Sequence, residues 1–371
     1  MRVLHVIPSI APGVGGPSRS VPRLVETLRE QGIDALLAAG GGSNDCDLPL
    51  DHLRFPGEIL SLGSKQKLAK AIESADVVEI HSLWNGTSSI AASLCQRRGV
   101  PYILTPRGML DPKCLSNHSL SKNLYRFLVD EANIRNASGF HFLSEEERAR
   151  ARVGRQISVW RVAVSPNGAI ETPEVPTGVL RKLFPQVDGR KVMLHLGRLD
   201  RIKRIEIQIQ ALAKIPADSR PTLLLVGPDY GDAHRLRRIV HDQRLESFVV
   251  FGGPVFGTER FGLLAEADLV VLTSSYDCNP VVATETLMMG GALLATEGCG
   301  LSTIADAGAV KVVPNSLDDF AAAARSLLVD HEVTSSLRKQ AKEYAHTTLA
   351  WKNVVHSLVQ LYERLITVHQ N

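Results

Sequence analysis

The sequence predicts an α/β protein built from two doubly wound parallel-sheet domains. Short apolar runs alternate with helix-like or loop segments along the chain, which is the pattern of βαβ units and of a parallel sheet. The runs form two similar sets on either side of residues 165–191, a segment with four prolines and three glycines. At 371 residues the chain is also too long for one ordinary hydrophobic core.

Each apolar run is a candidate strand. The runs are Val3–Ile7, Ala35–Ala38, Val77–Ile80, Tyr102–Leu104, Gly139–Phe142 and Ile157–Val164 in the first set, and Val192–Leu196, Thr222–Val226, Phe248–Phe251, Leu269–Leu272, Ala292–Ala295 and Val310–Val313 in the second. We place the first domain at residues 1–168, a linker at 169–190, the second domain at 191–348 and a terminal helix at 349–371. Ligands of open α/β sheets bind at the carboxyl ends of the strands, so two facing domains would enclose a deep cleft.

Composition excludes several classes of protein. A net charge of +3 does not indicate a nucleic-acid binder. The five cysteines show no CxxC pair and no metal spacing, so we expect reduced thiols and a cytoplasmic protein. The opening run MRVLHVIPSI is too short for a signal-peptide core and fits a buried strand. We also find no apolar stretch long enough to span a bilayer.

A glycine loop follows the first strand. Gly13, Gly15 and Gly16 precede a helix expected from about Ser18 to Gln31, and backbone N–H groups there suit a phosphate. The loop is not a dinucleotide fingerprint, because Ser18 stands at the third glycine position and no acid closes the second strand. This argues against NAD; a simple tight turn is the alternative.

Three side chains are candidates on the first domain. His81 ends a strand and Trp84 lies in the following loop, so both are expected to face the cleft, although isolated histidines are more often structural. Arg107 follows the next strand. As a guanidinium it cannot act as a general base, but it suits an acidic acceptor or a phosphate.

Two cations follow the first strand of the second domain. That strand ends at Leu196, Gly197 turns the chain, and Arg198 and Lys203 follow five residues apart. Cations in this position can hold a diphosphate and stabilise it as a leaving group. The alternative is a pair of solvated charges.

Two carboxylates lie farther along, in the stretch Leu272–Gly290. A strand, a polar loop and a helix follow in order, with Asn279 expected as N-cap and Pro280 as the first helical residue. N–H groups near Val281 and Val282 suit a phosphate. Asp277 lies in the loop, and Glu285 on the helix could accept two ribose hydroxyls. The alternative is a capped surface helix with one exposed acid.

Together these segments resemble the retaining GT-B glycosyltransferases of family 4. Gly15 and Gly16 match the family's glycine loop, Arg198 and Lys203 match G-R-L-x-x-x-K-G, and Asp277 and Glu285 match E-x7-E. The terminal helix also matches, with an apolar face at helical spacing: Trp351, Val354, Val355, Leu358, Leu361, Tyr362 and Leu365. The resemblance implies two Rossmann-like domains and transfer of a sugar from a nucleotide-sugar to a hydroxyl with retention.

The resemblance also implies roles for these residues. Arg198 and Lys203 would stabilise the leaving phosphate, Asp277 would orient the sugar, and Glu285 would hold the ribose. The base would lie near Gly227, Pro228 and Val255, while Asn279, Val281 and Val282 would complete the donor site. His81, Trp84 and Arg107 would lie on the acceptor side. We expect a UDP- or GDP-sugar donor, a glycan or lipid-linked glycan acceptor, and no cofactor or metal.

Three departures from the family pattern cluster at the expected reacting centre. Arg107 replaces the histidine of T-x-H-G, Arg204 replaces the last glycine of the Arg–Lys signature, and Asp277 is one methylene shorter than the usual glutamate. A subset of the family that takes part in polysaccharide assembly is similar around Arg107, where this chain reads PRGML. The departures leave open a non-catalytic nucleotide-binding glycan-assembly protein and a GT-B nucleotide-sugar epimerase.

Two further features of the sequence suggest other kinds of site. Asp45-Cys46-Asp47 is a D-x-D, the metal signature of the other large glycosyltransferase fold, but it lies in a polar loop without a supporting site. Basic residues on the first domain could dock on anionic membrane at its inner face, although the acids at 145–147 favour a solvated surface. The basic residues are Lys122, Arg126, Arg135, Arg148, Arg150, Arg152 and Arg155.

Overall fold

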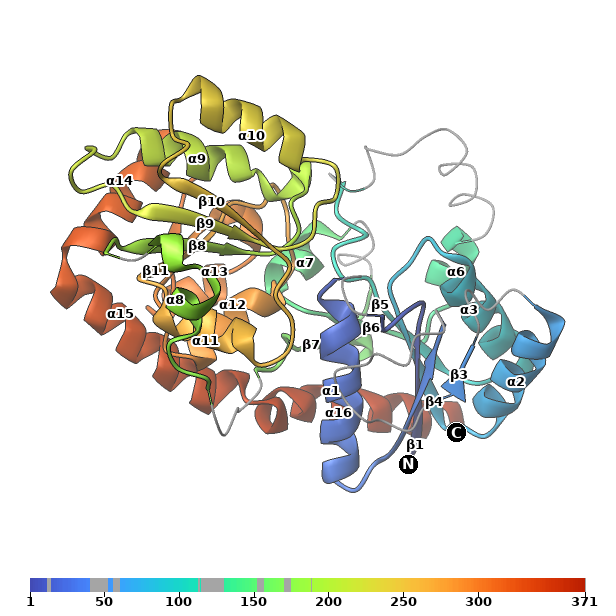
Figure 1. Cartoon of the computed structure of the whole chain (residues 1–371). Helices are drawn as coiled ribbons and strands as arrows, with labels where there is room; N and C mark the ends of the chain where they lie inside the picture. Colours follow the sequence, from blue (N-terminus) through green and yellow to red (C-terminus); the bar gives the residue numbers. More distant parts are fainter. Residues whose placement is uncertain are drawn as a thin grey trace. The chain divides into compact units, whose positions relative to one another are not determined.

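The computed structural model describes residues 1–11, 15–40, 53–55, 61–112, 114, 130–151, 157–169, 175–187 and 189–370. The chain forms two compact α/β units (Figure 1). The first combines Met1–Gly168 with Trp351–Asn371, and the second spans Ala169–Ala350. Residues 175–187 therefore belong to the second unit, and the last helix belongs to the first.

The first unit has a parallel sheet in the order β3-β2-β1-β4-β5-β6-β7. Its strands are β1 (Arg2–Ile7), β2 (Asp34–Ala39), β3 (Leu53–Arg54), β4 (Val77–His81), β5 (Tyr102–Thr105), β6 (Gly139–Phe142) and β7 (Val162–Val164). The strand order reverses between β1 and β4. In doubly wound sheets this is the point where ligands approach the carboxyl ends of the strands.

Successive side chains of each strand point to opposite faces of this sheet, so both faces are apolar. Helices cover both of them. In β1, Leu4 packs with α2 and α3, whereas Val3 packs with α1 and α16. Among the described residues of this unit, the helices are α1 (Pro17–Glu30), α2 (Leu62–Glu73), α3 (Gly86–Arg98), α6 (Glu131–Arg135), α7 (Glu145–Arg150) and α16 (Trp351–Gln370). The predicted apolar face of the terminal helix is confirmed, since α16 buries Val354, Val355, Leu358, Leu361, Tyr362 and Leu365 beside α1.

The second unit has a parallel sheet in the order β10-β9-β8-β11-β12-β13. Its strands are β8 (Val192–Leu196), β9 (Thr222–Val226), β10 (Val249–Gly253), β11 (Leu269–Leu272), β12 (Leu293–Thr296) and β13 (Lys311–Val313). One face packs against α9 (Ile205–Ala213), α10 (Ala233–Asp242) and α14 (Leu317–Val329). The other packs against α8 (Val179–Leu183), α11 (Glu259–Glu266), α12 (Val281–Met288) and α15 (His331–Tyr344), as Figure 1 shows. A short α13 (Ser302–Asp306) precedes β13.

Two local predictions need correction, and one strand was not predicted. The run Ile157–Val164 is a strand only from Val162, because a 3-10 turn at Val159–Arg161 leaves Trp160 45% exposed. The short edge strand β3 carries too few residues to show a period in the sequence. Helix α12 begins at Val281 with Pro280 as its N-cap, one residue later than expected, and no side chain caps it. Among the described helices, none is both long and apolar enough to cross a membrane.

Candidate functional site

The loops after β8 and β9 meet at a glycine contact in the second unit. Gly227 has a φ of +151°, and a Cβ on it would lie 1.8 Å from the carbonyl oxygen of Gly197. Leu199 and Asp229 then pair in a short parallel bridge. Only glycine permits this approach, which places the loop carrying Arg198 beside the loop after Gly227.

Lys203 and Asp277 form an ion pair across two strand ends. Lys203 Nζ lies 2.8 Å from Asp277 Oδ2, and the side chains are 19% and 20% exposed. Burial alone would lower the pKa of Lys203, but the Asp277 carboxylate raises it above its ordinary value, so the amine stays charged. The guanidinium carbon of Arg198 lies 4.8 Å from the centroid of the Tyr230 ring, and its positive charge acts on Lys203.

A buried polar group fixes the backbone that carries Lys203. Thr273 Oγ1 contacts the carbonyl oxygens of Lys203 and Arg204 at 2.8 and 3.0 Å, and Gln208 Nε2 donates to Thr273 Oγ1 at 2.9 Å. Gln208 Nε2 also lies 3.0 Å from Nδ1 of His195, whose pKa burial lowers to about 3. These contacts stabilise Arg204 in the left-handed region, at φ 48° and ψ 44°, where the family signature has glycine.

Sequence reasoning missed His195, Gln208 and Thr273. All three side chains are at most 1% exposed. The signal in the sequence was a single polar residue in or beside an apolar run, where burial is expected.

The Asp277 loop is held from a second side by the turn after β12. A Cβ on Gly298 would lie 2.2 Å from Ser274 O, and a Cβ on Gly300 would lie 2.6 Å from Asp277 O. Both glycines therefore permit backbone contact with the loop that presents Asp277.

Glu285 is a buried acid, so the alternative of an exposed acid on a surface helix is wrong. The residue is 2% exposed, and its Oε1 accepts from Arg260 Nη2 at 3.2 Å. Val282 and Asn279 nearby are also buried. Val281 is the first residue of α12, and the first N–H groups of a helix point along its axis without intrahelical partners. Val255 is partly buried and packs against the core of the second unit.

The glycine loop of the first unit leads directly into α1. Gly15 has a φ of +136°, and its carbonyl accepts from the backbone and hydroxyl of Ser18. Gly16 is the N-cap, Pro17 follows, and the first turn carries no acid. The first turn of α1 therefore offers positive helix-dipole potential without a local carboxylate to offset it. Gly13 lies outside the described residues.

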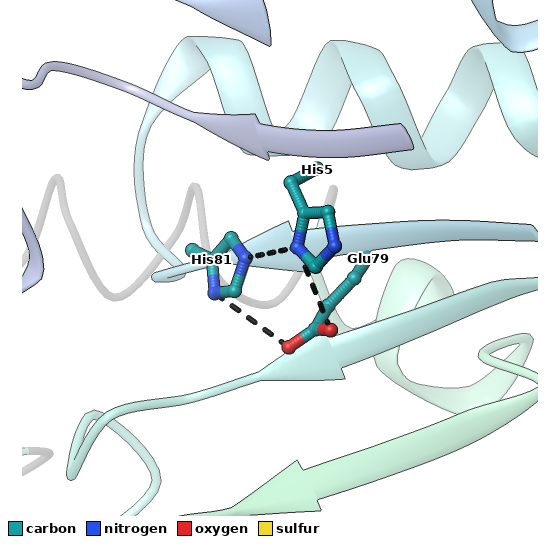
Figure 2. Close-up of side chains that lie close together, drawn as sticks. All are labelled: His5, Glu79 and His81. Carbon is teal, nitrogen blue, oxygen red and sulfur yellow. Dashed lines mark hydrogen bonds and ion pairs between the residues drawn. The ribbon is translucent and has the colours of Figure 1, made fainter. Parts of the chain in front are cut away.

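His81 lies inside the first unit, which corrects the prediction that it faces a cleft. It is 0% exposed, and its Nε2 lies 3.0 Å from His5 Nδ1 (Figure 2). The planes of the two rings are within 10° of parallel, and their centroids lie 5.3 Å apart. That distance is about the sum of the N–N distance and the two ring radii. The nitrogens therefore face each other directly. A metal ion on the line between these two nitrogens would need two metal–nitrogen bonds of about 2 Å each, or about 4 Å in all. The N–N distance of 3.0 Å is too short for that.

Glu79 is the anionic centre of this group. Its Oε1 accepts from Thr105 Oγ1 at 2.6 Å and lies 2.8 Å from His141 Nδ1, while Oε2 accepts from the hydroxyl of Tyr362. Burial favours the neutral acid, but charge interactions with His81 and His141 and the His141 hydrogen bond lower the pKa of Glu79 well below its usual value. Burial also lowers the pKa of His5 to about 4, so that ring is neutral at pH 7.

Arg107 joins this buried group to the strand ends. Its Nη2 lies 3.3 Å from His81 Nδ1, and its Nη1 lies 3.3 Å from Ser20 Oγ and from Asn167 Oδ1. Arginine only donates, so Nδ1 of His81 accepts and its proton is on Nε2, which donates to His5. The buried histidines thus determine where the guanidinium points. The backbone of Arg107 is left-handed, with a φ of 53°.

Trp84 is half-buried and supports its own loop. The indole Nε1 donates to the carbonyl of Met109 at 3.2 Å, and the ring packs against the core of the first unit. Of the basic residues considered for membrane contact, Arg148 pairs with Glu145 and Arg135 with Glu131, as expected of a solvated surface. Asp45, Asp47, Lys122, Arg126, Arg152 and Arg155 lie outside the described residues.

Comparison with known proteins identifies both halves of the chain. Residues 15–168 match the model of the glycosyl transferase 4-like domain, and residues 180–347 match the model of glycosyl transferases group 1. The chain is 22% identical over 321 residues to N-acetyl-alpha-D-glucosaminyl L-malate synthase of Bacillus anthracis, covering 86% of this chain and 82% of that protein.

Solved structures share the whole fold. Sucrose-phosphate synthase from Thermosynechococcus elongatus superposes with a TM-score of 0.76 at 21% identity, covering 99% of this chain and 100% of the other. HepE of Anabaena, solved in complex with UDP-glucose, superposes with a TM-score of 0.74 at 19% identity, covering 100% and 99%. With two parallel α/β units and both domain models matched in order, the chain belongs to the GT-B glycosyltransferases of the group 1, family 4-like type.

Proposed function

We propose that this glycosyltransferase moves a sugar from a UDP-sugar to an acceptor hydroxyl with retention at the anomeric carbon. The observation that carries the proposal is the 2.8 Å pair of Lys203 and Asp277, in which strand-end loops 74 residues apart present a cation and an acid together. The matched family uses nucleotide-sugar donors. A structural neighbour was solved with UDP-glucose, which supports uracil as the base.

In the proposed mechanism, the donor diphosphate meets Lys203 and Arg198 at the end of β8. Both cations stabilise the charge that develops as the diphosphate leaves, in a region where partial burial strengthens their field. The acceptor attacks from the same face, and the leaving phosphate takes its proton. This route needs no carboxylate nucleophile and no metal. Asp277 orients the sugar.

The rest of the donor would extend along the same unit. Glu285 would accept the ribose hydroxyls, and backbone groups near Gly227 and Val255 would meet the base. N–H groups at the start of α12, at Val281 and Val282, would complete the phosphate contacts beside Asn279.

For the acceptor we propose a hydroxyl compound that carries an anionic group, such as the phosphate of a lipid-linked glycan at the inner face of a membrane. Arg107 would bind that group, since its guanidinium is aimed by His81, Ser20 and Asn167 at the end of β5. The L-malate in the name of the Bacillus anthracis relative is an acidic acceptor, which supports this class.

A thermal-shift panel with UDP, GDP, ADP and NAD tests the donor site, with Glu285→Ala as the comparison variant. A ligand that binds the folded protein raises its melting temperature by mass action. We expect UDP to stabilise the wild type and to stabilise the variant much less. Stabilisation by NAD alone would contradict the proposal.

Product analysis with the matching sugar nucleotide then tests the reaction. Formation of a glycosylated acceptor that keeps the anomeric configuration of the donor supports retaining transfer. Release of free epimerised sugar without acceptor would indicate an epimerase. Nucleotide binding with no product from any acceptor would indicate a non-catalytic protein.

A further inference from the structure

Glu285 has a charged partner that the family motifs do not include. Arg260, on α11, directs Nη2 to Glu285 Oε1 at 3.2 Å, and the two side chains are 7% and 2% exposed. Helices α11 and α12 pack against each other in the second unit. The contact is therefore a buried ion pair between neighbouring helices, 25 residues apart in the sequence.

The arginine itself is held on two other sides. Its Nη1 donates to the carbonyl of Gly257 at 3.1 Å, and its guanidinium carbon lies 4.3 Å from the centroid of the Phe261 ring. Gly257 turns the chain with a φ of +64° just before α11. The guanidinium is thus anchored to the end of its own helix while it reaches across to Glu285.

Two physical consequences follow for Glu285. Burying a charged group is costly unless a group of opposite charge lies against it, and Arg260 supplies that partner. The directional hydrogen bond from the guanidinium to Oε1 also selects one orientation of the carboxyl plane. Both effects prepare the group to receive hydroxyl donors.

We propose that Arg260 is a positioning residue for the ribose of the nucleotide donor. It lies against Glu285 as a charge partner and holds its carboxyl group in the orientation that accepts the 2′- and 3′-hydroxyls. The inference rests on the proposed role of Glu285 in donor binding. It predicts that loss of Arg260 weakens the preference for ribose over dideoxyribose, and not only the overall affinity.

Calorimetric titration of the full-length protein with UDP and with 2′,3′-dideoxy-UDP measures that preference as a ratio of dissociation constants. We expect the wild type to prefer UDP on the order of 10–100-fold, the effect of hydrogen bonds to a charged acceptor. In Arg260→Gln the ratio should fall to about threefold or less. Arg338→Gln is the matched control, because Arg338 bonds the backbone at Ala267 and Asp268 in the same unit. Its ratio should equal that of the wild type.

A cycle with Glu285→Gln tests the coupling. If Arg260 acts through Glu285, the ratio in the double variant should equal that in Glu285→Gln alone. Should Arg260→Gln fail to fold, Arg260→Lys keeps the charge without the planar fork, and its ratio should still fall at least threefold.

The outcomes separate the inference from the proposed function. A wild type that binds none of UDP, GDP and ADP contradicts the proposed function. If the panel selects GDP or ADP, the same pair of ribo and dideoxy nucleotides is used with that base. A wild type that prefers ribose, with an unchanged ratio in the Arg260 variants, contradicts the inference alone. A ratio that falls equally in Arg338→Gln assigns the effect to general destabilisation and also overturns it.

Discussion

At the scale of single residues, the protein depends on charges whose partners lie far away in the sequence. Lys203 remains an ammonium because Asp277 lies against it, and Glu79 remains a carboxylate because hydroxyls and imidazoles surround it. Each group keeps its charge in the folded protein, although burial opposes it, because a partner distant in the sequence compensates that charge. Substitutions at these residues should therefore change function or pH dependence in specific ways.

Lys203→Ala should lower turnover at saturating donor on the order of 10²–10³-fold, because one cation at the leaving diphosphate is lost. Steady-state rates with the donor identified in the nucleotide panel would measure this effect. Lys214→Ala is the control, since Lys214 pairs with Asp318 at the exposed surface. Unchanged turnover in Lys203→Ala would remove Lys203 from the mechanism.

Stability should fall as the pH is lowered from about 6.5 toward 4, because His5 and His195 have pKa values of about 4 and about 3 when folded, against 6.5 ordinarily. In this range the unfolded chain binds protons that the folded chain does not, so acid favours unfolding. Melting temperatures across the range should decline less steeply for His195→Gln than for the wild type. Equal slopes would argue against a neutral buried His195.

At the scale of elements, glycines allow the strand-end loops to touch. Gly227→Ala should destabilise the second unit by about 2–4 kcal/mol, because a Cβ 1.8 Å from Gly197 O forces two backbones apart. Chemical denaturation measures the change. Gly63→Ala in α2 is the control, since nothing lies within 4 Å of its Cβ position, and alanine there should be neutral or stabilising. A loss below about 1 kcal/mol at Gly227 would show that the loops separate easily.

At the scale of the whole molecule, the two units differ in how the chain builds them. The second unit is continuous from Ala169 to Ala350, whereas the first needs α16 from the far end of the chain. Residues 169–350 expressed alone should therefore unfold cooperatively on heating. Residues 1–168 alone should lack fixed tertiary packing by near-ultraviolet circular dichroism, because Tyr362 and the apolar face of α16 complete their core. Cooperative melting of 1–168 alone would contradict this reading.

Much of the fold followed from local patterns. Strands β1, β4, β8 and β11 are apolar runs, and α16 has an apolar face at helical spacing. Both patterns depend on residues close in the sequence, so hydrophobicity and its period predict these elements. The short strand β3 and the 3-10 turn before β7 were missed. The turn exposes apolar side chains, and a two-residue edge strand has no period to detect.

The sequence by itself determined the two α/β units, the order of the strand-end loops and the residue types at the donor site, because these depend on local propensity and motif spacing. Only the tertiary structure decided how those residues are partnered. It paired Lys203 with Asp277, gave Glu285 its Arg260 and placed His81 in the core, where it aims Arg107. Such pairings join side chains 25–74 residues apart, and packing of sheet and helices, not local pattern, brings them together.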